Sequence, residues 1–204
     1  MRERQGAVAG VVLAAGASTR MGRNKLLFAL QGVSVLRRAV VQPSGAGLDP
    51  VVVVLGHEAE RARQELEGLN VRLALNPAYL EGITGSLRAG ILALPSEAQA
   101  AVVMLADMPL VTTDMLATMV QRFRSGTAPL VISEYDGVNA PPMLYDRSLF
   151  PELLASEEGG GREVVRRHRD EAEVVSWPAS ALGDLDVPSD YERIRAQLDG
   201  TAPD

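Results

Sequence analysis

Short apolar runs recur along the chain, separated by more polar segments with helical spacing or loop composition. The runs are rich in Val, Leu and Ala and occupy residues 11–15, 51–55, 71–75, 101–105 and 129–133, with a weaker run at 173–176. Apolar runs of about five residues are typical of strands buried on both faces of a parallel sheet. Because helical segments alternate with these runs, the pattern predicts an α/β fold with a doubly wound, mostly parallel sheet.

The first three predicted helices lie at residues 33–41, 58–66 and 87–94. The first should close at Pro43, because proline cannot continue the hydrogen bonding of a helix. The third should follow a loop-like stretch at 79–87.

A fourth helix should be capped by Thr112 or Thr113, and a closing helix should begin near Pro188. The apolar residues of the fourth helix follow a 3.6-residue period and should face the core: Met115, Leu116, Met119, Val120 and Phe123. In the closing helix Tyr191, Ile194 and Leu198 should share one face. Between these helices the proline-containing segment 139–143 predicts a turn.

Residues that could bind a ligand follow the carboxyl ends of two predicted strands. The run 101–105 is the most apolar and should lie near the centre of the sheet, so Asp107 should lie where open α/β sheets bind their ligands. The run 11–15 leads into the small residues 16–19, whose backbone N–H groups could approach phosphate oxygens closely. Arg20, Arg23 and Lys25 add positive charge to this loop.

The spacing in this loop excludes two common phosphate-binding motifs. A P-loop would place a lysine directly after its second glycine, whereas Lys25 lies three residues beyond Gly22. A dinucleotide fingerprint would need a glycine where Ser18 stands. A dinucleotide-dependent oxidoreductase is therefore improbable.

The string L-A-A-G-x-S-x-R-M-G-x-x-K at residues 13–25 resembles the opening motif of the MobA-like nucleotidyltransferases, in particular the molybdenum cofactor cytidylyltransferases. Residues 76–90 and the segment D-L-D-V-P-S-D-Y at 184–191 resemble later motifs of that family. Two segments depart from its pattern, at 139–143 and at 158–162. The resemblance implies a single Rossmann-like, three-layer domain of the nucleotide-diphospho-sugar transferase type.

The resemblance also implies roles for individual residues. Expected catalytic residues are Arg20, Lys25 and Asp107. Expected ligands of a Mg²⁺ cofactor are Asp107 and Asp186. Expected nucleotide-binding residues are Leu13, Ala14, Ala15, Gly16, Ser18, Gly22, Asn76, Gly82 and Ser86, of which Ser86 could equally cap the helix that follows.

The expected reaction is an in-line attack by a substrate phosphate on the α-phosphorus of a nucleoside triphosphate, which releases pyrophosphate. Relatives that use CTP tend to read L-A-A-G where relatives that use GTP read L-A-G-G, so Ala15 favours CTP over GTP. The resemblance implies molybdopterin carrying its metal as the acceptor, and a molybdoenzyme or its maturation chaperone as a further partner.

Composition limits the alternatives. The chain has 204 residues, a net charge of −6, no cysteine and two histidines. These values favour one domain, and they disfavour nucleic-acid binding and cysteine-based or multi-histidine metal sites. The family resemblance implies that the core of this domain spans about 7–198, and we expect the terminal residues 200–204 to be a disordered tail. We expect a cytoplasmic protein, because no apolar run reaches the roughly 20 residues of a membrane span. We expect Arg37 and Arg38 to lie on a solvated helix face.

Two other functions remain open. A nucleotidyltransferase of the same fold could act on a sugar phosphate, a polyol phosphate or another small-molecule phosphate. A non-catalytic protein could bind or deliver a nucleotide or molybdenum cofactor. The carrier predicts tight binding without release of pyrophosphate, whereas either transferase releases it.

Overall fold

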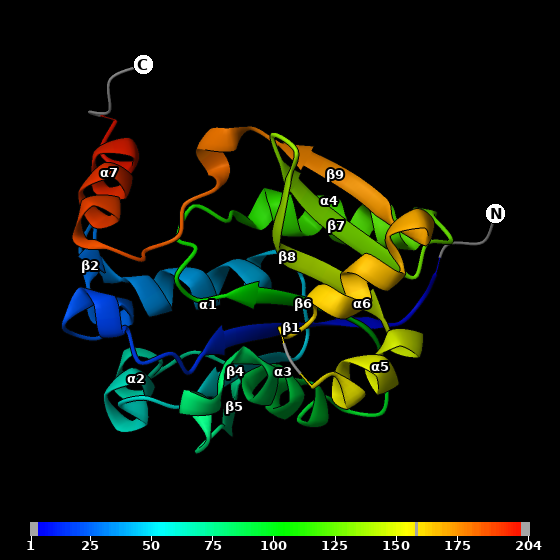
Figure 1. The fold of residues 1–204 in the computed structure, drawn as a ribbon, viewed down its shortest axis with the longest axis horizontal. Helices are drawn as coiled ribbons and strands as arrows, with labels where there is room; N and C mark the ends of the chain where they lie inside the picture. The colour runs from blue at the N-terminus through cyan, green and yellow to red at the C-terminus, as the bar shows by residue number, and fades with distance from the viewer. Residues whose placement is uncertain (1–3, 158, 201–204) are drawn as a thin grey trace.

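The computed structural model describes residues 4–157 and 159–200, with only the backbone of Arg20 (Figure 1). Seven strands form one sheet in the order β5-β4-β1-β6-β8-β7-β9. Their bounds are β1 Ala7–Ala14, β4 Val51–Leu55, β5 Arg72–Leu75, β6 Ala98–Leu105, β7 Leu130–Tyr135, β8 Val138–Asp146 and β9 Glu173–Trp177. Strand β8 is antiparallel to both of its neighbours, and the other adjacent pairs are parallel. Strands β2 (Ala29–Leu30) and β3 (Val33–Ser34) form a separate antiparallel pair.

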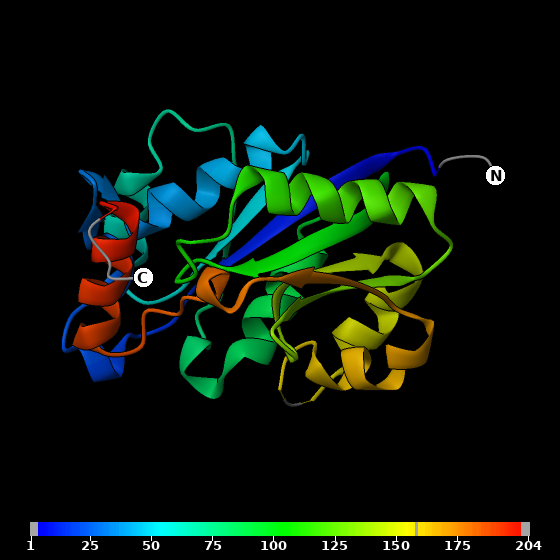
Figure 2. The same cartoon turned by 90° about the horizontal axis from the view of Figure 1, so that it is seen from above.

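Helices cover both faces of the sheet (Figure 2). One face carries α1 (Val35–Gly45), α2 (Ala59–Glu65) and α4 (Thr113–Ser125), and the other carries α3 (Ile83–Leu92), α5 (Phe150–Ala155) and α6 (Arg162–Arg167). Helix α7 (Pro188–Leu198) lies at one end of the molecule. The 3₁₀ helices η1 to η6 cover Thr19–Met21, Lys25–Leu27, Tyr79–Glu81, Arg147–Leu149, Arg169–Glu171 and Ala179–Ala181. This three-layer arrangement confirms the predicted fold class.

The central strands are the most apolar ones, as predicted. Strand β6 is the fourth of seven in the sheet, so Asp107, just beyond its carboxyl end, lies at the middle of the sheet edge. The five apolar residues predicted to face the core from α4 are all buried. Within the described ranges there is no helix whose length and hydropathy would allow it to span a bilayer.

Two predicted helix boundaries are wrong. Helix α1 continues past Pro43 to Gly45, since a proline in the last turn removes only one hydrogen bond and its buried ring packs beside Gly10. Helix α3 begins at Ile83, within the stretch expected to be a loop. Gly82, with a φ of 111°, precedes it as the N-cap residue, so Ser86 lies inside the helix and does not cap it.

The turn predicted at 139–143 is also wrong, because these residues belong to β8. The prolines suggested a turn since they cannot donate to a strand ladder. The register explains how β8 tolerates them: Met143 pairs with Ile132 and Asn139 with Glu134, and an irregularity lies between these pairs. The prolines therefore occupy a bulge, where no ladder hydrogen bond is lost.

Helix α4 begins with a side-chain cap at one of the two predicted positions. The hydroxyl of Thr112 accepts a hydrogen bond from Met115 N at 3.3 Å. We expect Thr112→Ala to lower the free energy of unfolding by about 1 kcal/mol, the usual effect of losing such a cap. Thr118→Ala, on the exposed side of the same helix, is the matched control and should change stability by less. Urea denaturation of both variants measures the difference, and equal effects would contradict the capping role.

Helix α7 attaches to the segment that follows Lys25. The hydroxyl of Tyr191 donates to Ala29 O at 2.6 Å, and its ring packs edge-on against Phe28 with centroids 5.4 Å apart. Gln31 Nε2 donates to Leu198 O at 2.8 Å. Val187 supplies no side-chain cap to this helix. The carboxylate of Asp190 instead accepts from the backbone nitrogens of residues 186 and 187, at 3.0 and 2.9 Å.

Candidate nucleotidyl-transfer site

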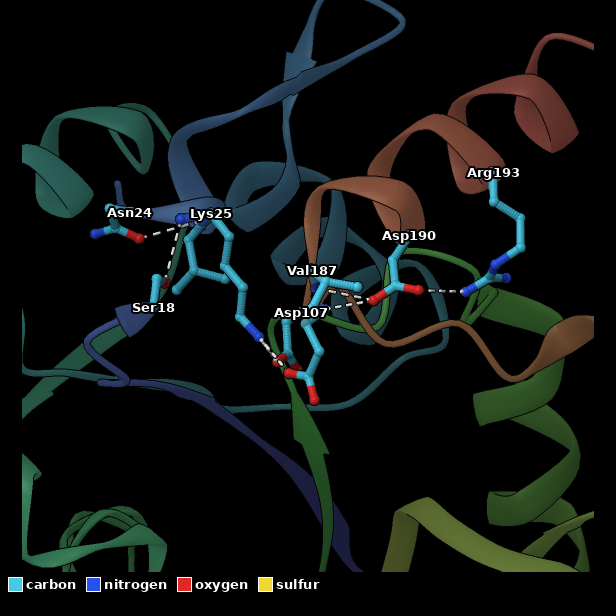
Figure 3. Close-up of polar contacts among 9 residues, drawn as sticks. Ser18, Asn24, Lys25, Asp107, Val187, Asp190 and Arg193 are labelled. Carbon is cyan, nitrogen blue, oxygen red and sulfur yellow. Dashed lines mark hydrogen bonds and ion pairs between the residues drawn. The ribbon is translucent and has the colours of Figure 1, made fainter. Parts of the chain in front are cut away.

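The loop after β1 folds back on itself and aims Lys25 at the sheet edge. Ser18 and Gly22 have positive φ values of 52° and 69°, which reverse the chain on either side of η1. The hydroxyl of Ser18 accepts from Lys25 N at 3.2 Å, and Asn24 Oδ1 accepts from Leu26 N at 3.1 Å (Figure 3). These bonds fix the start of η2, so the Lys25 side chain extends toward the carboxyl end of β6.

A cleft of about 290 Å³ lies beside this loop. Nine of the residues predicted to be functional line it: Leu13, Ala14, Ala15, Gly16, Ser18, Lys25, Gly82, Ser86 and Asp107. They come from the ends of β1 and β6, from η2 and from the start of α3. A volume near 300 Å³ is at the lower end of small-ligand sites, which suits part of a nucleotide.

Lys25 joins the two aspartates predicted to bind a metal. Its Nζ lies 2.5 Å from Asp107 Oδ2 and 3.2 Å from Asp186 Oδ1 (Figure 3 shows the ammonium directed at the carboxylates). Burial of Lys25 opposes its charge, but the attraction of Asp107 and hydrogen bonds to both carboxylates outweigh it and raise the pKa of the ammonium above its usual value. Lys25 therefore stays charged in the folded protein at neutral pH.

Backbone contacts bring Asp186 to Asp107 from a distant part of the sequence. Leu185 N donates to Asp107 O at 3.1 Å, which ties the segment before α7 to the end of β6. The Asp190 carboxylate then holds the backbone of Asp186 from the other side. Partial desolvation, together with the carboxylates of Asp107 and Asp186, raises the pKa of Asp184. Asp184 is thus a third carboxylate near the pair, and the first aspartate of the D-L-D motif was the sequence signal for it.

The chemistry of these donors fits Mg²⁺, which in proteins binds one or two carboxylates and completes its shell with phosphate and water. One cation, the Lys25 ammonium, already contacts both Asp107 and Asp186. In the described part of the chain no group of three His, Cys, Asp or Glu residues is arranged to hold a metal ion. A metal at this pair would consequently depend on oxygen ligands from the substrate.

Some predicted residues do not line the cleft. Gly22, Asn76 and Asp186 are absent from its lining. Asp186 contacts Lys25, which does line the cleft. The side chain of Arg20 lies outside the described residues. Asn76 is 5% exposed and donates from Nδ2 to the hydroxyl of Ser86 at 3.0 Å, while its Oδ1 accepts from Ala78 N. The structure thus gives this pair a structural role at the base of the cleft.

We expect Ser86→Ala to lower the free energy of unfolding by about 1–3 kcal/mol, because the buried Nδ2 of Asn76 loses its acceptor. If Ser86 serves only as this support, the dissociation constant for a nucleotide should change much less than stability does. Urea denaturation and nucleotide titration of the same variant separate the two roles. A variant of normal stability that binds nucleotide poorly would show instead that Ser86 contacts the ligand.

The cleft has walls that the sequence did not identify: Leu26, Tyr79, Ile83 and Leu105. Tyr79 approaches the opening loop closely, since a Cβ at Gly56 would lie 2.8 Å from the Cβ atoms of both Ala15 and Tyr79. His57 N also donates to Ala15 O at 3.1 Å. A glycine directly after a buried strand was the available signal for this close packing.

The comparisons with known proteins agree with this geometry. The model of the MobA-like NTP transferase domain matches residues 10–172. The chain belongs to this family. The matched range contains the opening loop, the cleft and Asp107, while Asp186 lies beyond it.

Two curated relatives and one solved structure match between 63% and 94% of the chain. The purine catabolism protein PucB of Bacillus subtilis is 29% identical over 202 residues, covering 93% of this chain and 96% of PucB. The bifunctional protein GlmU of Geotalea uraniireducens is 31% identical over 132 residues, covering 63% of this chain but only 29% of GlmU. The crystal structure of Rv0371c from Mycobacterium tuberculosis has a TM-score of 0.83 at 25% identity and covers 94% of this chain and 99% of Rv0371c.

Two further structures bear on the fold and on the metal. A nucleotidyl transferase from Methanothermobacter has a TM-score of 0.82 at 23% identity over 96% of this chain and 99% of its own, a likeness in fold. Rv0371c also has a structure in complex with manganese, with a TM-score of 0.77 at 25% identity over 94% of this chain and 98% of its own. The seven-stranded sheet and the likeness to these solved structures together show that the chain has the nucleotide-diphospho-sugar transferase type of fold.

Proposed function

We propose that this MobA-like protein transfers a nucleotidyl group, CMP in preference to GMP, from a nucleoside triphosphate to the phosphate of molybdenum cofactor. Pyrophosphate is the second product, and Mg²⁺ is the cofactor. The observation that carries the proposal is the contact of Lys25 with both Asp107 and Asp186 at the mouth of a cleft lined by the small residues of the opening loop.

Asp107 and Asp186 would hold the metal, which when bound supplies positive charge that neutralises phosphate oxygens. The protein's own residues do the rest. Lys25 is a mobile point charge, so it can leave the two carboxylates and attract the oxygens of the departing pyrophosphate. The backbone of residues 16–18 lies against the cleft with little side-chain bulk, which allows the triphosphate to approach. Arg20 would add a directional clamp on the same phosphates.

Proton transfer places few demands on this site. The attacking group is a phosphate monoester, whose second pKa lies near 6, so it is already ionised at neutral pH. A general base is therefore not required. Once Lys25 neutralises the leaving oxygens, the remaining task of the site is to hold the two phosphates in line.

The preference for CTP rests on Ala15. This residue lines the cleft, yet it is 3% exposed and its methyl group is packed beside Gly56. Its influence on the base would act through the position of the loop against Tyr79, because the methyl group itself is covered. If this space between the opening loop and Tyr79 is narrower than in relatives that read L-A-G-G, it favours a pyrimidine over the larger purine ring.

The molybdopterin acceptor is supported by the resemblance of the opening motif to the molybdenum cofactor cytidylyltransferases. A molybdoenzyme or its maturation chaperone would then receive the product. A nucleotidyltransferase for another small-molecule phosphate would use the same Lys25 and carboxylate pair. A carrier that binds without turnover is less well supported, since it has no use for a lysine poised between two potential metal ligands.

The test is pyrophosphate release by the purified protein with Mg²⁺, comparing CTP with GTP in the presence and absence of molybdenum cofactor. Release that requires both CTP and the cofactor supports the whole proposal. Release with CTP and a different phosphorylated acceptor keeps the transferase and replaces the acceptor. Tight binding of CTP without release under any condition would favour the carrier.

A further inference from the structure

A second cavity, of about 490 Å³, lies at the same end of the sheet as the cleft but under α1, α4 and α7. Its walls come from the loop after Asp107, from the end of β9 with η6, and from one side of α1. It shares no lining residue with the first cleft. Cavities of about 300–1,000 Å³ are the size of small-molecule sites.

Two nitrogen donors from residues that line this cavity lack an acceptor. Arg38 Nε and Trp177 Nε1 are buried, and neither has a hydrogen-bond partner among the described residues. A buried donor without a hydrogen-bond partner is unfavourable, so its presence at a cavity needs an explanation. Two other polar side chains of the lining already have partners: Gln42 Oε1 accepts from Thr113, and Gln197 Nε2 donates to Ser180 O.

The charges at this cavity favour an anion. Among the described residues that line it, Arg38 is the one charged side chain, and its Nη2 donates to the neutral Gln31 amide at 2.8 Å. The N-terminus of α4, which begins after Thr112 in the cavity wall, adds the positive end of a helix dipole. Leu110, Met115 and Trp177 supply apolar surface around these groups. Arg38 is half-buried, with its Nε covered and its Nη2 contact to Gln31 exposed, so the helix face expected to be solvated is solvated only in part at this residue.

We propose that this cavity is a second ligand site, which binds a small anion with a flat apolar body. The carboxylate or phosphate group of the ligand accepts from Arg38, and its body packs on the ring of Trp177. Because both free nitrogens are covered, binding includes a small rotation of these side chains. That movement gives the unsatisfied Nε of Arg38 an acceptor, which provides part of the binding energy.

The position of the cavity makes its ligand an effector of the first site. Pro109 and Leu110 follow closely after Asp107, and η6 precedes Asp186 by a few residues. The two wall segments are in close contact, since a Cβ at Gly183 would lie 2.6 Å from Leu110 Cδ1. Leu185 N joins them again at Asp107 O. A ligand between these segments would shift Asp107 relative to Asp186.

The test uses Trp177, which is the single tryptophan of the sequence and lines this cavity. Its fluorescence is titrated with benzoate and with phenyl phosphate. Two incomplete probes are titrated as controls: inorganic phosphate, which lacks the apolar body, and benzyl alcohol, which lacks the charge. We expect a saturable change with the two aromatic anions and about tenfold or more weaker binding of the two incomplete probes. The absence of a saturable change with either aromatic anion would overturn the proposal.

Variants of two neighbouring arginines on α1 supply the control. Arg38→Met keeps the aliphatic stem and should weaken binding about tenfold or more, the usual loss for a hydrogen bond to a charged group. Arg37→Met removes the same charge from the same helix, where Arg37 donates to Glu65 O and Glu67 O away from the cavity, and should leave binding intact. Circular dichroism of each variant verifies the fold. Equal loss in both variants would contradict a site built on Arg38.

Saturating CTP with Mg²⁺ separates this site from the first. The fluorescence response to phenyl phosphate should persist in the presence of the nucleotide, because the two cavities share no residue. Coupling between the two sites can change the apparent affinity of the probe only up to a fixed limit. A loss of affinity that keeps growing in proportion to the CTP concentration would place the probe in the nucleotide cleft and overturn the proposal. The fluorescence readout does not depend on the proposed reaction, so failure of nucleotidyl transfer would leave this inference standing.

Discussion

Lys25→Met is expected to lower the rate of pyrophosphate release about a hundredfold or more. The substitution keeps an unbranched side chain one atom shorter and removes the charge that contacts Asp107 and Asp186. Loss of one preorganised electrostatic contact with developing charge typically has an effect of this size. Steady-state kinetics with CTP and the proposed acceptor measure it, and the loss should appear in kcat more than in KM, because the contact with the departing pyrophosphate strengthens in the transition state.

The control for this variant lies in the same loop. Arg23 is exposed, and its guanidinium lies over the ring of Phe28, 4.2 Å from the centroid. Arg23→Met removes an equal charge from the loop and should change kcat little. Equal losses in the two variants would show that the general charge of the loop matters, and that the position of Lys25 does not.

The difference in stability between the wild type and Lys25→Met should also depend on pH in a defined direction. The folded state raises the pKa of this ammonium, so the stabilisation from its contacts is fully present below the ordinary lysine pKa of about 10.4. It is lost as pH rises through the higher folded-state value. The difference in unfolding free energy between the wild type and Lys25→Met should therefore be constant from pH 6 to 9 and shrink only at more alkaline pH.

Asp107→Asn is expected to lower the same rate by a comparable factor, about a hundredfold or more, and to raise the Mg²⁺ concentration needed for half-maximal rate. The amide has the same shape but lacks the negative charge that a hard cation requires. The carboxylate also holds Lys25 at 2.5 Å, so its loss removes the partner that positions the ammonium. Kinetics across a series of Mg²⁺ concentrations measure both effects.

Two further aspartate variants make this prediction specific. Asp114→Asn changes an exposed carboxylate in the first turn of α4 and should leave the Mg²⁺ dependence unaltered. Asp186→Asn should resemble Asp107→Asn, and the double variant should be much less impaired than the product of the single effects, because both carboxylates act on one cation. Fully multiplicative losses would mean that the two aspartates act independently.

The strands were predictable because each is a local apolar run that a parallel sheet can bury on both faces. The prediction for Val51–Leu55 matches the strand residue for residue. Strand β8 was missed because its prolines are tolerated by a bulge opposite β7, a feature of the partner strand that no local pattern contains. The start of α3 was missed because contacts from far along the chain support it, such as Gly160 N donating to Thr84 Oγ1 at 3.0 Å.

The candidate site was likewise predictable only in part. The family motif identified Lys25, Asp107 and Asp186, and the structure brings these three together. The motif did not separate residues that face the cleft from residues that support it. Asn76 was therefore predicted to bind nucleotide, although its side chain is turned inward to Ser86. The glycine directly after β4 signals close packing at Gly56, but only the folded chain shows that Tyr79 is one of the residues packed there.

The attachment of α7 to the segment after Lys25 has a consequence for biosynthesis. Helix α7 is synthesised long after the loop that carries Lys25, yet its Tyr191 and Leu198 contacts fix the segment that follows Lys25, and Asp186 lies just before it. Domains generally fold as units as they leave the ribosome, with N-terminal parts available first. A nascent chain halted before Pro188 could form the central strands but would hold Asp186 without the Asp190 support. The contact of Lys25 with both carboxylates is therefore completed only after a segment 161 positions further along the chain has been synthesised and held in place by α7.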